Sequence, residues 1–433
     1  MGSMLNAGDQ LNSVNNVAYQ VVRLLGAGGQ GEVYEVSAGG KGYALKWYYE
    51  RTATNEQRAI IDNLISKGTP DGKFLWPKDK IEKNNTFGYI MDLRPQKFKS
   101  IIDLMKRKTE PTFSTLCMAG INVADGYHKM HASGYCYRDI SFGNLFFDPD
   151  NGDVLICDND NVTVNGTRDC SIYGTQRFMA PEIVRGEQPP STDTDLFSLA
   201  VLLFYMFMIH HPLEGAIESN IKCFDMAAMN MIYGKNPIFI WDPVNDSNRP
   251  VAGYQDNAIV FWDLYPQALK DVFTNAFTEG LANPRKRILE YQWKDALIQL
   301  KNSIIYCPAC QSENFYDIQK VKNGVEHICW NCKKAISLPP RMKIGNSLIM
   351  LNRGSKIYSH HVEGNYDMVT AVGEVNQHPQ DPSKWGIRNV SKGIWTYIKK
   401  DGASLTVESG KNAPLSAGAK INFGSRVGEI KTI

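Results

Sequence analysis

The chain has 433 residues, of which 43% are hydrophobic and 21% charged, proportions typical of a folded protein with several domains. Lys and Arg together number 47 and Asp and Glu 45, so the formal net charge of +2 gives no reason to expect nucleic acid or an anionic membrane as the main partner. No apolar stretch reaches the about 18 residues that a membrane span needs. The longest stretch, residues 196–209, is therefore predicted to be a buried helix. The nine cysteines and the lack of a basic-then-apolar leader predict a protein of the reducing cytoplasm.

Three regions with different patterns follow one another along the chain. Residues 17–301 are dense in apolar residues, residues 306–338 hold two pairs of cysteines, and residues 343–433 have the pattern of short strands between Gly, Asn and Pro. We expect one domain for each region, with Pro339-Pro340 as a linker. Residues 1–16 are assigned to a tag and an N-terminal extension.

The first region changes from a strand pattern to a helix pattern. Residues 19–48 alternate between apolar and polar side chains, as strands do, whereas residues from Ser114 onward follow a helical period. The apolar face expected for that helix consists of Leu116, Gly120, Val123, Tyr127 and Met130. A strand-rich front and a helix-rich back predict two lobes.

A glycine-rich segment and a lysine suggest a phosphate site in the first lobe. Residues 26–33 fit the pattern G-x-G-x-x-G-x-V, in which Gly26, Gly28 and Gly31 let backbone amides approach phosphate oxygens. The plain alternative is a tight hairpin, and a dinucleotide fold is disfavoured because a strand, not a helix, follows. Lys46 lies in an apolar strand and would hold the phosphates of a nucleotide; the alternative is a lysine at the sheet edge.

The sequence around residue 139 resembles the catalytic loop of eukaryotic-type protein kinases. Residues 137–144 read Tyr-Arg-Asp-Ile-Ser-Phe-Gly-Asn, which is similar to H-R-D-x-x-x-x-N. The resemblance implies that Asp139 accepts the proton of the substrate hydroxyl and that Asn144 holds a magnesium ion. Asp158 stands where the family has the Asp of D-F-G, which implies a second magnesium ligand.

Further motifs follow in the order of the family. Ala180-Pro181-Glu182 is similar to A-P-E, Gly174-Thr175 precedes it as in Ser/Thr kinases, and the resemblance implies that Arg287 pairs with Glu182. The implied fold is α+β: a bilobal protein-kinase fold over residues 17–301. The implied activity is phosphoryl transfer from ATP, with magnesium, to Ser or Thr hydroxyls of protein substrates.

The resemblance also assigns the remaining nucleotide contacts. Glu56, on the expected helix after Thr54, is the best candidate for the acidic partner of Lys46, and the alternative is an ordinary exposed glutamate. Asp92 and Leu93 are the expected adenine hinge, with Met91 behind it. The full set expected to contact ATP and magnesium is Gly26, Gly28, Gly31, Val33, Ala44, Lys46, Met91, Asp92, Leu93, Asn144 and Asp158.

Several positions depart from the family pattern. Tyr137 replaces His, Ser141 replaces a Lys that contacts the transferred phosphate, and Asn159 and Asp160 replace Phe and Gly. We predict an active enzyme because Lys46 and the three residues at 139, 144 and 158 are retained. The alternatives are a pseudokinase scaffold that binds nucleotide and assembles partners, supported by the departures, and a small-molecule kinase, which the A-P-E segment disfavours.

The four paired cysteines have the spacing of a metal site. Cys307, Cys310, Cys329 and Cys332 fit C-x₂-C-x₁₈-C-x₂-C, which predicts a closed tetrahedral zinc ribbon with a structural role. The alternative is four unligated thiols. His327 is expected at the surface and is not needed as a ligand.

The last region resembles a forkhead-associated (FHA)-type β-sandwich. Its expected strands lie near 347–351, 393–399, 404–407 and 419–423. We find no convincing copy of the phosphothreonine-binding motifs, so a docking or regulatory role is favoured and phosphopeptide binding is the alternative.

The layout of the three regions is similar to that of bacterial Ser/Thr kinases that accompany a metal-dependent phosphatase and a von Willebrand A-type (vWA) protein. It implies these two partners besides protein substrates, and a role in bacterial signalling. The candidate sites of regulatory phosphorylation are Thr163, Thr167, Ser171 and Tyr173.

Overall fold

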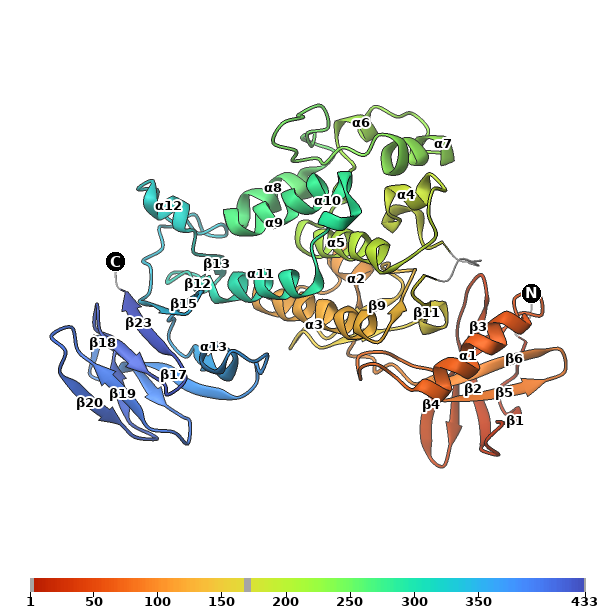
Figure 1. The fold of residues 1–433 in the computed structure, drawn as a ribbon, viewed down its shortest axis with the longest axis horizontal. Coiled ribbons are helices and arrows are strands. Elements are labelled where there is room, and N and C mark those ends of the chain that lie inside the picture. The colour runs from red at the N-terminus through yellow and green to blue at the C-terminus, as the bar shows by residue number, and fades with distance from the viewer. Residues whose placement is uncertain (1–3, 167–172, 432–433) are drawn as a thin grey trace. The chain divides into compact units, whose positions relative to one another are not determined.

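The computed structural model describes residues 4–166 and 173–431 (Figure 1). The chain forms two compact units, one of residues Met1–Phe261 and Asp271–Lys294 and one of Trp262–Lys270 and Asp295–Ile433. Among the described residues, no helix is both long enough and apolar enough to cross a bilayer.

The first unit begins with an antiparallel sheet in the strand order β1-β2-β3-β4-β6-β5. Its inner face buries Val21, Tyr34, Leu45 and Ile90, as the alternating pattern predicts. The strands are β1 (Gln10–Asn12), β2 (Ala18–Ala27), β3 (Gly31–Ala38), β4 (Lys41–Tyr48), β5 (Asp79–Lys83) and β6 (Thr86–Asp92).

The first strand lies within the segment that the sequence assigns to an extension. Residues Gln10–Asn12 pair with β2, and Leu5 and Leu11 are buried in the core of the sheet. The segment before residue 17 therefore adds one strand to the sheet and two apolar side chains to its core.

Helix α1 (Asn55–Lys67) lies beside this sheet (Figure 1). The hydroxyl of Thr54 accepts a hydrogen bond from the N–H of Gln57 and caps the helix, as predicted. Ile61 and Leu64 are its buried residues.

The rest of this unit is mainly helical. All five residues of the predicted apolar face of α3 (Phe113–Ala132) are buried. Helix α5 (Thr192–Met208) is buried from Thr194 to its end, which confirms the predicted core helix. The remaining helices up to residue 302 are α2 (Ile101–Met105), α4 (Pro181–Val184), α6 (Ala216–Ser219), α7 (Met226–Asn230), α8 (Asp256–Leu264), α9 (Gln267–Phe277), α10 (Glu279–Ala282) and α11 (Glu290–Asn302), with shorter turns η1 (Asn159–Asn161), η2 (Gln176–Phe178), η3 (Met231–Lys235) and η4 (Pro284–Lys286). The unit bounds fall within α8, α9 and α11, so each of these three helices has residues in both units.

Two small sheets position the loops of this unit. β9 (Leu145–Phe147) pairs with β10 (Val154–Ile156) and with β7 (Lys99–Ser100), and β8 (Tyr135–Cys136) pairs with β11 (Thr163–Val164). Because Leu145 is opposite Ile156, the residue before β9 and the residues after β10 lie at the same end of the hairpin.

The second unit starts with the hairpin of β12 (Ile304–Tyr306) and β13 (Glu313–Phe315), followed by α12 (Ile318–Lys322). This hairpin carries Cys307 and Cys310, and Cys329 and Cys332 follow α12. Cys307 and Cys329 are buried in a core with Ile305, Tyr316 and Met350. The carbonyl of Pro340 accepts a hydrogen bond from the N–H of Leu351.

Two antiparallel sheets complete the second unit and share one core. Their orders are β15-β14-β23-β22-β19-β20 and β16-β17-β18-β21. The core includes Met342 and Trp395 from the first sheet and Ile357 and Ile387 from the second. The elements are β14 (Arg341–Ile344), β15 (Ser347–Met350), β16 (Lys356–Tyr358), α13 (Ser359–Glu363), β17 (Ala371–His378), β18 (Asp381–Asn389), β19 (Trp395–Ile398), β20 (Ser404–Val407), β21 (Asn412–Pro414), β22 (Lys420–Asn422) and β23 (Val427–Lys431).

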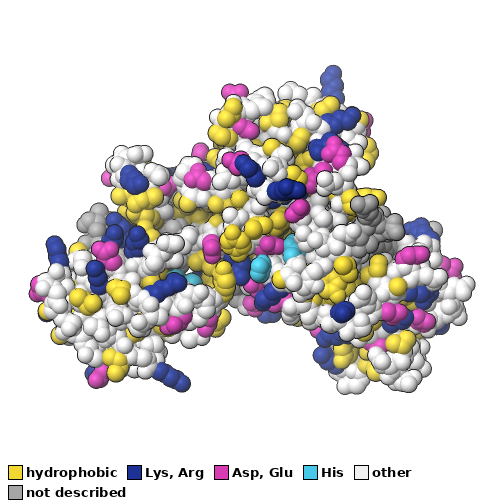
Figure 2. Space-filling model, in the orientation of Figure 1, with side chains coloured by type: hydrophobic (Ala, Val, Ile, Leu, Met, Phe, Trp, Pro, Cys, Tyr) yellow, Lys and Arg dark blue, Asp and Glu magenta, His cyan; other side chains and the backbone are white. Residues whose placement is uncertain are grey.

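Side chains of both charge signs are interspersed on the face of the molecule that Figure 2 shows. This distribution agrees with the near-zero formal charge of the sequence.

Candidate active site

The glycine-rich segment forms the turn between β2 and β3. The N–H of Gly28 donates to the carbonyl of Gly31 at 2.9 Å, and a strand follows, as the sequence predicts. A side chain at Gly31 would collide with the backbone carbonyl of Trp47, since its Cβ would lie 2.1 Å from that oxygen. At Gly26 and Gly28 a Cβ would meet nothing within 4 Å, so these two glycines leave open space beside the turn.

Lys46 is buried in the middle of β4, with 5% of its surface exposed. Its Nζ contacts the Asp160 carboxylate at 2.8 Å, Asp158 Oδ1 at 3.5 Å and Gln30 Oε1 at 2.9 Å. Burial alone would lower the pKa of Lys46, but the charges of Asp160 and Asp158 outweigh it and raise that pKa. The ammonium is therefore charged at neutral pH, as binding of phosphate requires.

Four more of the residues expected to contact the nucleotide lie on the same sheet: Val33 on β3, Ala44 on β4, and Met91 and Asp92 on β6. Val33 is opposite Lys46, and Ala44 is opposite Met91, which is 5% exposed. The side chain of Asp92 forms ion pairs with Lys78 and Lys41, so its backbone and not its carboxylate is available for a hinge contact. Leu93 follows directly after β6.

Asp139 and Asn144 are held together in one loop. The side-chain amide of Asn144 donates to Asp139 Oδ2 at 3.2 Å and to the Asp139 carbonyl at 2.8 Å. Thr175 donates to Asp139 Oδ1 from its backbone N–H and from its hydroxyl, at 2.9 and 2.8 Å. The orientation of the Asp139 carboxylate is therefore fixed from both sides.

The backbone of this loop is tied to a buried carboxylate on α5. Asp195 accepts hydrogen bonds from the N–H groups of Tyr137 and Arg138. The Tyr137 hydroxyl donates to the carbonyl of Cys157. The replacement of His by Tyr137 thus supplies a hydrogen bond from the catalytic loop to the segment before Asp158.

Asp158 lies next to Asn144 through the β9–β10 hairpin. The N–H of Cys157 donates to the carbonyl of Asn144 at 2.8 Å, and Asp158 adopts a left-handed conformation with φ of 50°. The Asp158 side chain is 42% exposed. Carboxylate and amide oxygens are the donors that magnesium prefers, so the residues present fit the ion that the sequence predicts.

The two residues after Asp158 are fully buried. The Asn159 amide donates to the carbonyls of Leu75 and Ile156 at 2.9 and 3.0 Å. Asn159 therefore holds this loop by hydrogen bonds at the position where the family has a packed aromatic ring. The next residue, Asp160, is 0% exposed and contacts Lys46.

Glu56 does not reach Lys46, and this prediction is wrong. Glu56 is exposed in the first turn of α1, where hydrogen bonds from its own N–H and from the Thr54 hydroxyl lower its pKa. Gln57 points inward instead, and its amide donates to the Tyr48 hydroxyl and to the carbonyl of Asp160. With so short a connection from β4, residue 56 falls at the start of the helix and on its solvent side.

The contribution of Asp160 was not predicted from the sequence, in which this residue stands out only as a departure from a glycine. The available signal was its position two residues after Asp158, the expected metal ligand, because a carboxylate buried there needs a cation as its partner.

The candidate phosphorylation sites are unevenly placed. Thr163 is half-buried on β11, and its hydroxyl lies 3.7 Å from Cys136 Sγ, whereas Tyr173 is 51% exposed. Thr167 and Ser171 lie outside the described residues.

Arg287 and Glu182 form the predicted pair. Two parallel hydrogen bonds of 2.8 Å join the guanidinium to the carboxylate, and both residues are buried.

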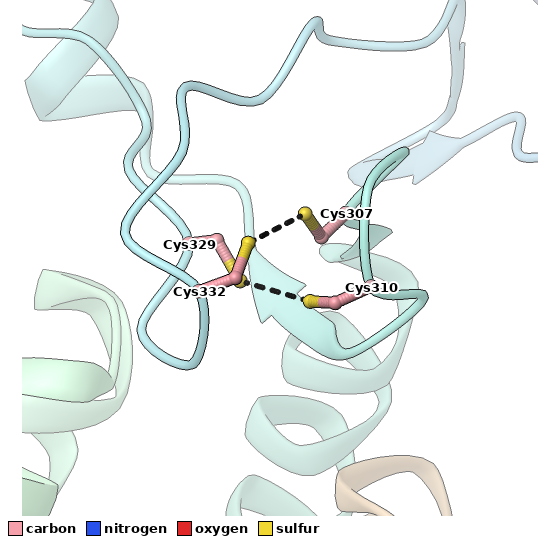
Figure 3. Close-up of side chains that lie close together, drawn as sticks. All are labelled: Cys307, Cys310, Cys329 and Cys332. Atoms are coloured by element: carbon pink, nitrogen blue, oxygen red, sulfur yellow. Dashed lines mark hydrogen bonds between the residues drawn. The ribbon is translucent and has the colours of Figure 1, made fainter.

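The four cysteines converge in the second unit (Figure 3). All four sulfurs lie within 4.8 Å of one another, with Cys307 and Cys332 at 3.5 Å and Cys310 and Cys329 at 3.6 Å. Four thiols at this separation fit a tetrahedral ion. His327 is buried and not at the surface as expected, because its Nε2 accepts the N–H of Asp317 and its ring stacks on Tyr316.

Comparison with known proteins gives the same family as these motifs. The chain is 26% identical over 212 residues to the serine/threonine-protein kinase PkaB of Streptomyces coelicolor, covering 46% of this chain and 50% of that protein. It is 24% identical over 221 residues to the cell cycle serine/threonine-protein kinase CDC5/MSD2 of Saccharomyces cerevisiae, covering 48% and 31%. It is 27% identical over 176 residues to the protein kinase gsk3 of Schizosaccharomyces pombe, covering 39% and 41%.

These matches span half or less of the length of the relatives. The match to the protein kinase domain family is broader, since it extends over residues 19–282, which is more than half of the chain. The chain therefore belongs to the protein kinase domain family.

Proposed function

We propose that this chain transfers the γ-phosphoryl group of ATP to Ser or Thr hydroxyls of proteins, itself included. The observation that carries the proposal is the pair of contacts that join Lys46 to Asp158 and Asn144 to Asp139 within one unit. Phosphoryl transfer depends on positioning and charge neutralisation, and these four residues supply the groups for both.

Each residue has a distinct role in the proposed reaction. Asp139 accepts the proton of the attacking hydroxyl, and Lys46 holds the α and β phosphates. The turn at Gly26 and Gly28 leaves the triphosphate room to approach the backbone. Asn144 and Asp158 offer oxygen ligands to magnesium, which when bound would neutralise charge on the phosphates.

Two observations favour Ser and Thr as acceptors. Thr175 holds the Asp139 carboxylate, and it belongs to the Gly174-Thr175 pair that is typical of Ser/Thr kinases. The relatives PkaB and CDC5/MSD2 are both named as serine/threonine-protein kinases.

The experiment is transfer from labelled ATP in the presence of magnesium, with the chain and a generic acceptor such as casein. We expect incorporation into phosphoserine or phosphothreonine, and the Asp139→Asn variant should lose at least about a hundredfold in rate because the proton acceptor is gone. Asp150→Asn makes the same change at an exposed position after β9 and should retain activity. Binding of nucleotide by the wild type without transfer to any acceptor, itself included, would instead favour the pseudokinase scaffold.

A small-molecule kinase is disfavoured by the buried Arg287–Glu182 pair. This pair ties the A-P-E segment to η4, and small-molecule kinases of the same fold generally lack that segment.

We further propose that Cys307, Cys310, Cys329 and Cys332 bind one structural zinc ion. Four thiolates leave no coordination position for water, so the ion would stabilise the hairpin and not act as a catalyst. The contact from the Asn314 amide to Cys329 Sγ at 3.6 Å supports an ordered sulfur cluster.

The two-sheet region is proposed to be a docking or regulatory module. Ser359, His360 and His361 are buried in α13, and His361 Nε2 contacts Asn302 Oδ1 at 3.0 Å, so these residues offer little to an external phosphopeptide. Three predictions rest on the sequence alone. The FHA-type classification rests on resemblance, and the phosphatase and vWA partners and the role in bacterial signalling rest on the layout of the three regions.

A further inference from the structure

Lys46, the residue expected to anchor the nucleotide, makes its closest acidic contact with Asp160 and not with a residue of α1. Lys46 Nζ lies 2.8 Å from Asp160 Oδ2 and 3.0 Å from Asp160 Oδ1, closer than the 3.5 Å to Asp158. Among the described residues, Asp158 and Asp160 are the carboxylates paired with Lys46. Both belong to the loop that follows β10.

The surroundings of Asp160 form a site for a carboxylate. Asp160 is 0% exposed, and its oxygens accept hydrogen bonds from the hydroxyls of Tyr48 and Tyr89 as well as from Lys46. The Gln57 amide holds its backbone carbonyl at 3.1 Å. A fully buried carboxylate is strongly unfavourable without such partners, so the position is specified by its neighbours.

Helix α1 has no carboxylate at the corresponding place. Gln57 is the α1 residue that points toward this cluster, and its side chain is a neutral amide. Glu56, one position earlier, is exposed. The charge that fixes Lys46 therefore comes from the loop and not from the helix.

We propose that Asp160 is the positioning residue for Lys46, in place of the acidic residue on the helix that the family uses. Asp158 would then offer its carboxylate to the metal ion, while Asp160 orients the lysine for the α and β phosphates. The position of Lys46 is set by the metal-binding loop and does not depend on a charge carried by α1. This proposal rests on the proposed kinase function, because it concerns nucleotide bound at the same residues.

The primary test compares two charge-removing substitutions, Asp160→Asn and Glu56→Gln, in the full chain. Affinity for Mg·ADP is measured by calorimetry, and KM for ATP and kcat are measured in the transfer assay. Asp160→Asn should weaken Mg·ADP binding and raise KM for ATP by about tenfold, since it removes a charged hydrogen bond from Lys46. Glu56→Gln should change both by less than about twofold, since Glu56 is exposed.

A double-mutant cycle separates positioning of Lys46 from general support of the fold. In a Lys46→Met background, Asp160→Asn should change Mg·ADP affinity by less than about twofold, because the residue on which Asp160 acts is gone. Additive losses in the cycle would overturn the proposal. So would a wild-type affinity in Asp160→Asn, or a tenfold loss in Glu56→Gln. If Asp160→Asn alone does not fold, a tenfold loss in Glu56→Gln still overturns the proposal.

The two proposals fail in different ways. If the wild type neither binds Mg·ADP nor transfers phosphate, the proposed function is wrong. If the wild type does both and Asp160→Asn behaves like the wild type, only the assignment of Asp160 is wrong.

Discussion

The guanidinium of Arg287 and the carboxylate of Glu182 meet in the interior through two hydrogen bonds of 2.8 Å, although 105 positions separate them in the chain. Arg287 also donates to the carbonyl of Asp193, at the start of α5. The pair thus joins the segment that follows Thr175 to the helix that anchors the catalytic loop.

Arg287→Ala should destabilise the first unit by about 3–5 kcal/mol, because it leaves the Glu182 carboxylate buried without its cation. Chemical denaturation followed by fluorescence measures this free energy of unfolding. Arg285→Ala, an exposed arginine in the same turn, should change it by less than about 0.5 kcal/mol. Equal effects of the two substitutions would show that the buried pair contributes nothing specific.

Tyr137→Phe should lower stability by about 1 kcal/mol and reduce kcat. The substitution keeps the ring but removes the hydroxyl that donates to the Cys157 carbonyl, next to Asp158. Denaturation and initial rates measure the two effects. Tyr291→Phe removes a hydroxyl from a tyrosine that is 45% exposed and serves as the control. An unchanged kcat in Tyr137→Phe would contradict a role for this contact in placing Asp158.

The raised pKa of His131 predicts how the stability of the protein changes above neutral pH. Burial favours the neutral ring, but hydrogen bonds to Asp195 and Glu290, with the charges of both, raise the pKa of His131 to about 9 from the usual 6.5. Its contribution to stability is therefore fully present below about pH 6.5 and is lost as the pH rises through about 9.

The measurement is the free energy of unfolding of the wild type and of His131→Gln at a series of pH values. The difference between the two proteins should shrink by a few kcal/mol between about pH 6.5 and 9. His128 also lies near Glu290, at 4.0 Å, so His128→Gln is a useful second comparison. A wild-type minus variant difference that is constant over this range would rule out the raised pKa.

Removal of zinc should destabilise the second unit. We expect about one zinc ion per chain, and a strong chelator or Cys329→Ser should remove the ion and lower the melting temperature of that unit. Cys223→Ser changes an exposed cysteine outside the cluster and should keep both the metal and the melting temperature. Well under one ion per chain, with all thiols reduced, would refute the metal site.

Much of the first unit could be predicted because local patterns and family motifs agree there. The strands of residues 19–48 and the buried face of α3 follow directly from apolar periodicity. The strand β1 could not be assigned in this way, because three residues carry too short a pattern and their pairing with β2 depends on tertiary contacts.

The partner of Lys46 was mispredicted because the family pattern assigns it to a helix. A shift of one residue on a helix turns a side chain by about 100°, which decides whether Glu56 or Gln57 faces the cluster. The sequence contains the acidic residue that is used, Asp160, but the cation that makes its burial acceptable is 114 positions away.

The boundary between the β12–β13 hairpin and the two sheets is less clear in the structure than in the sequence. Pro339-Pro340 has the composition of a linker, yet the Pro340 carbonyl is bonded to Leu351, and Met350 of β15 lies in the same apolar cluster as Cys307 and Cys329. Cutting the chain there would expose apolar surface on both fragments. The two parts should therefore unfold in one cooperative step. Neither should fold as an independent domain when it is fused to another protein.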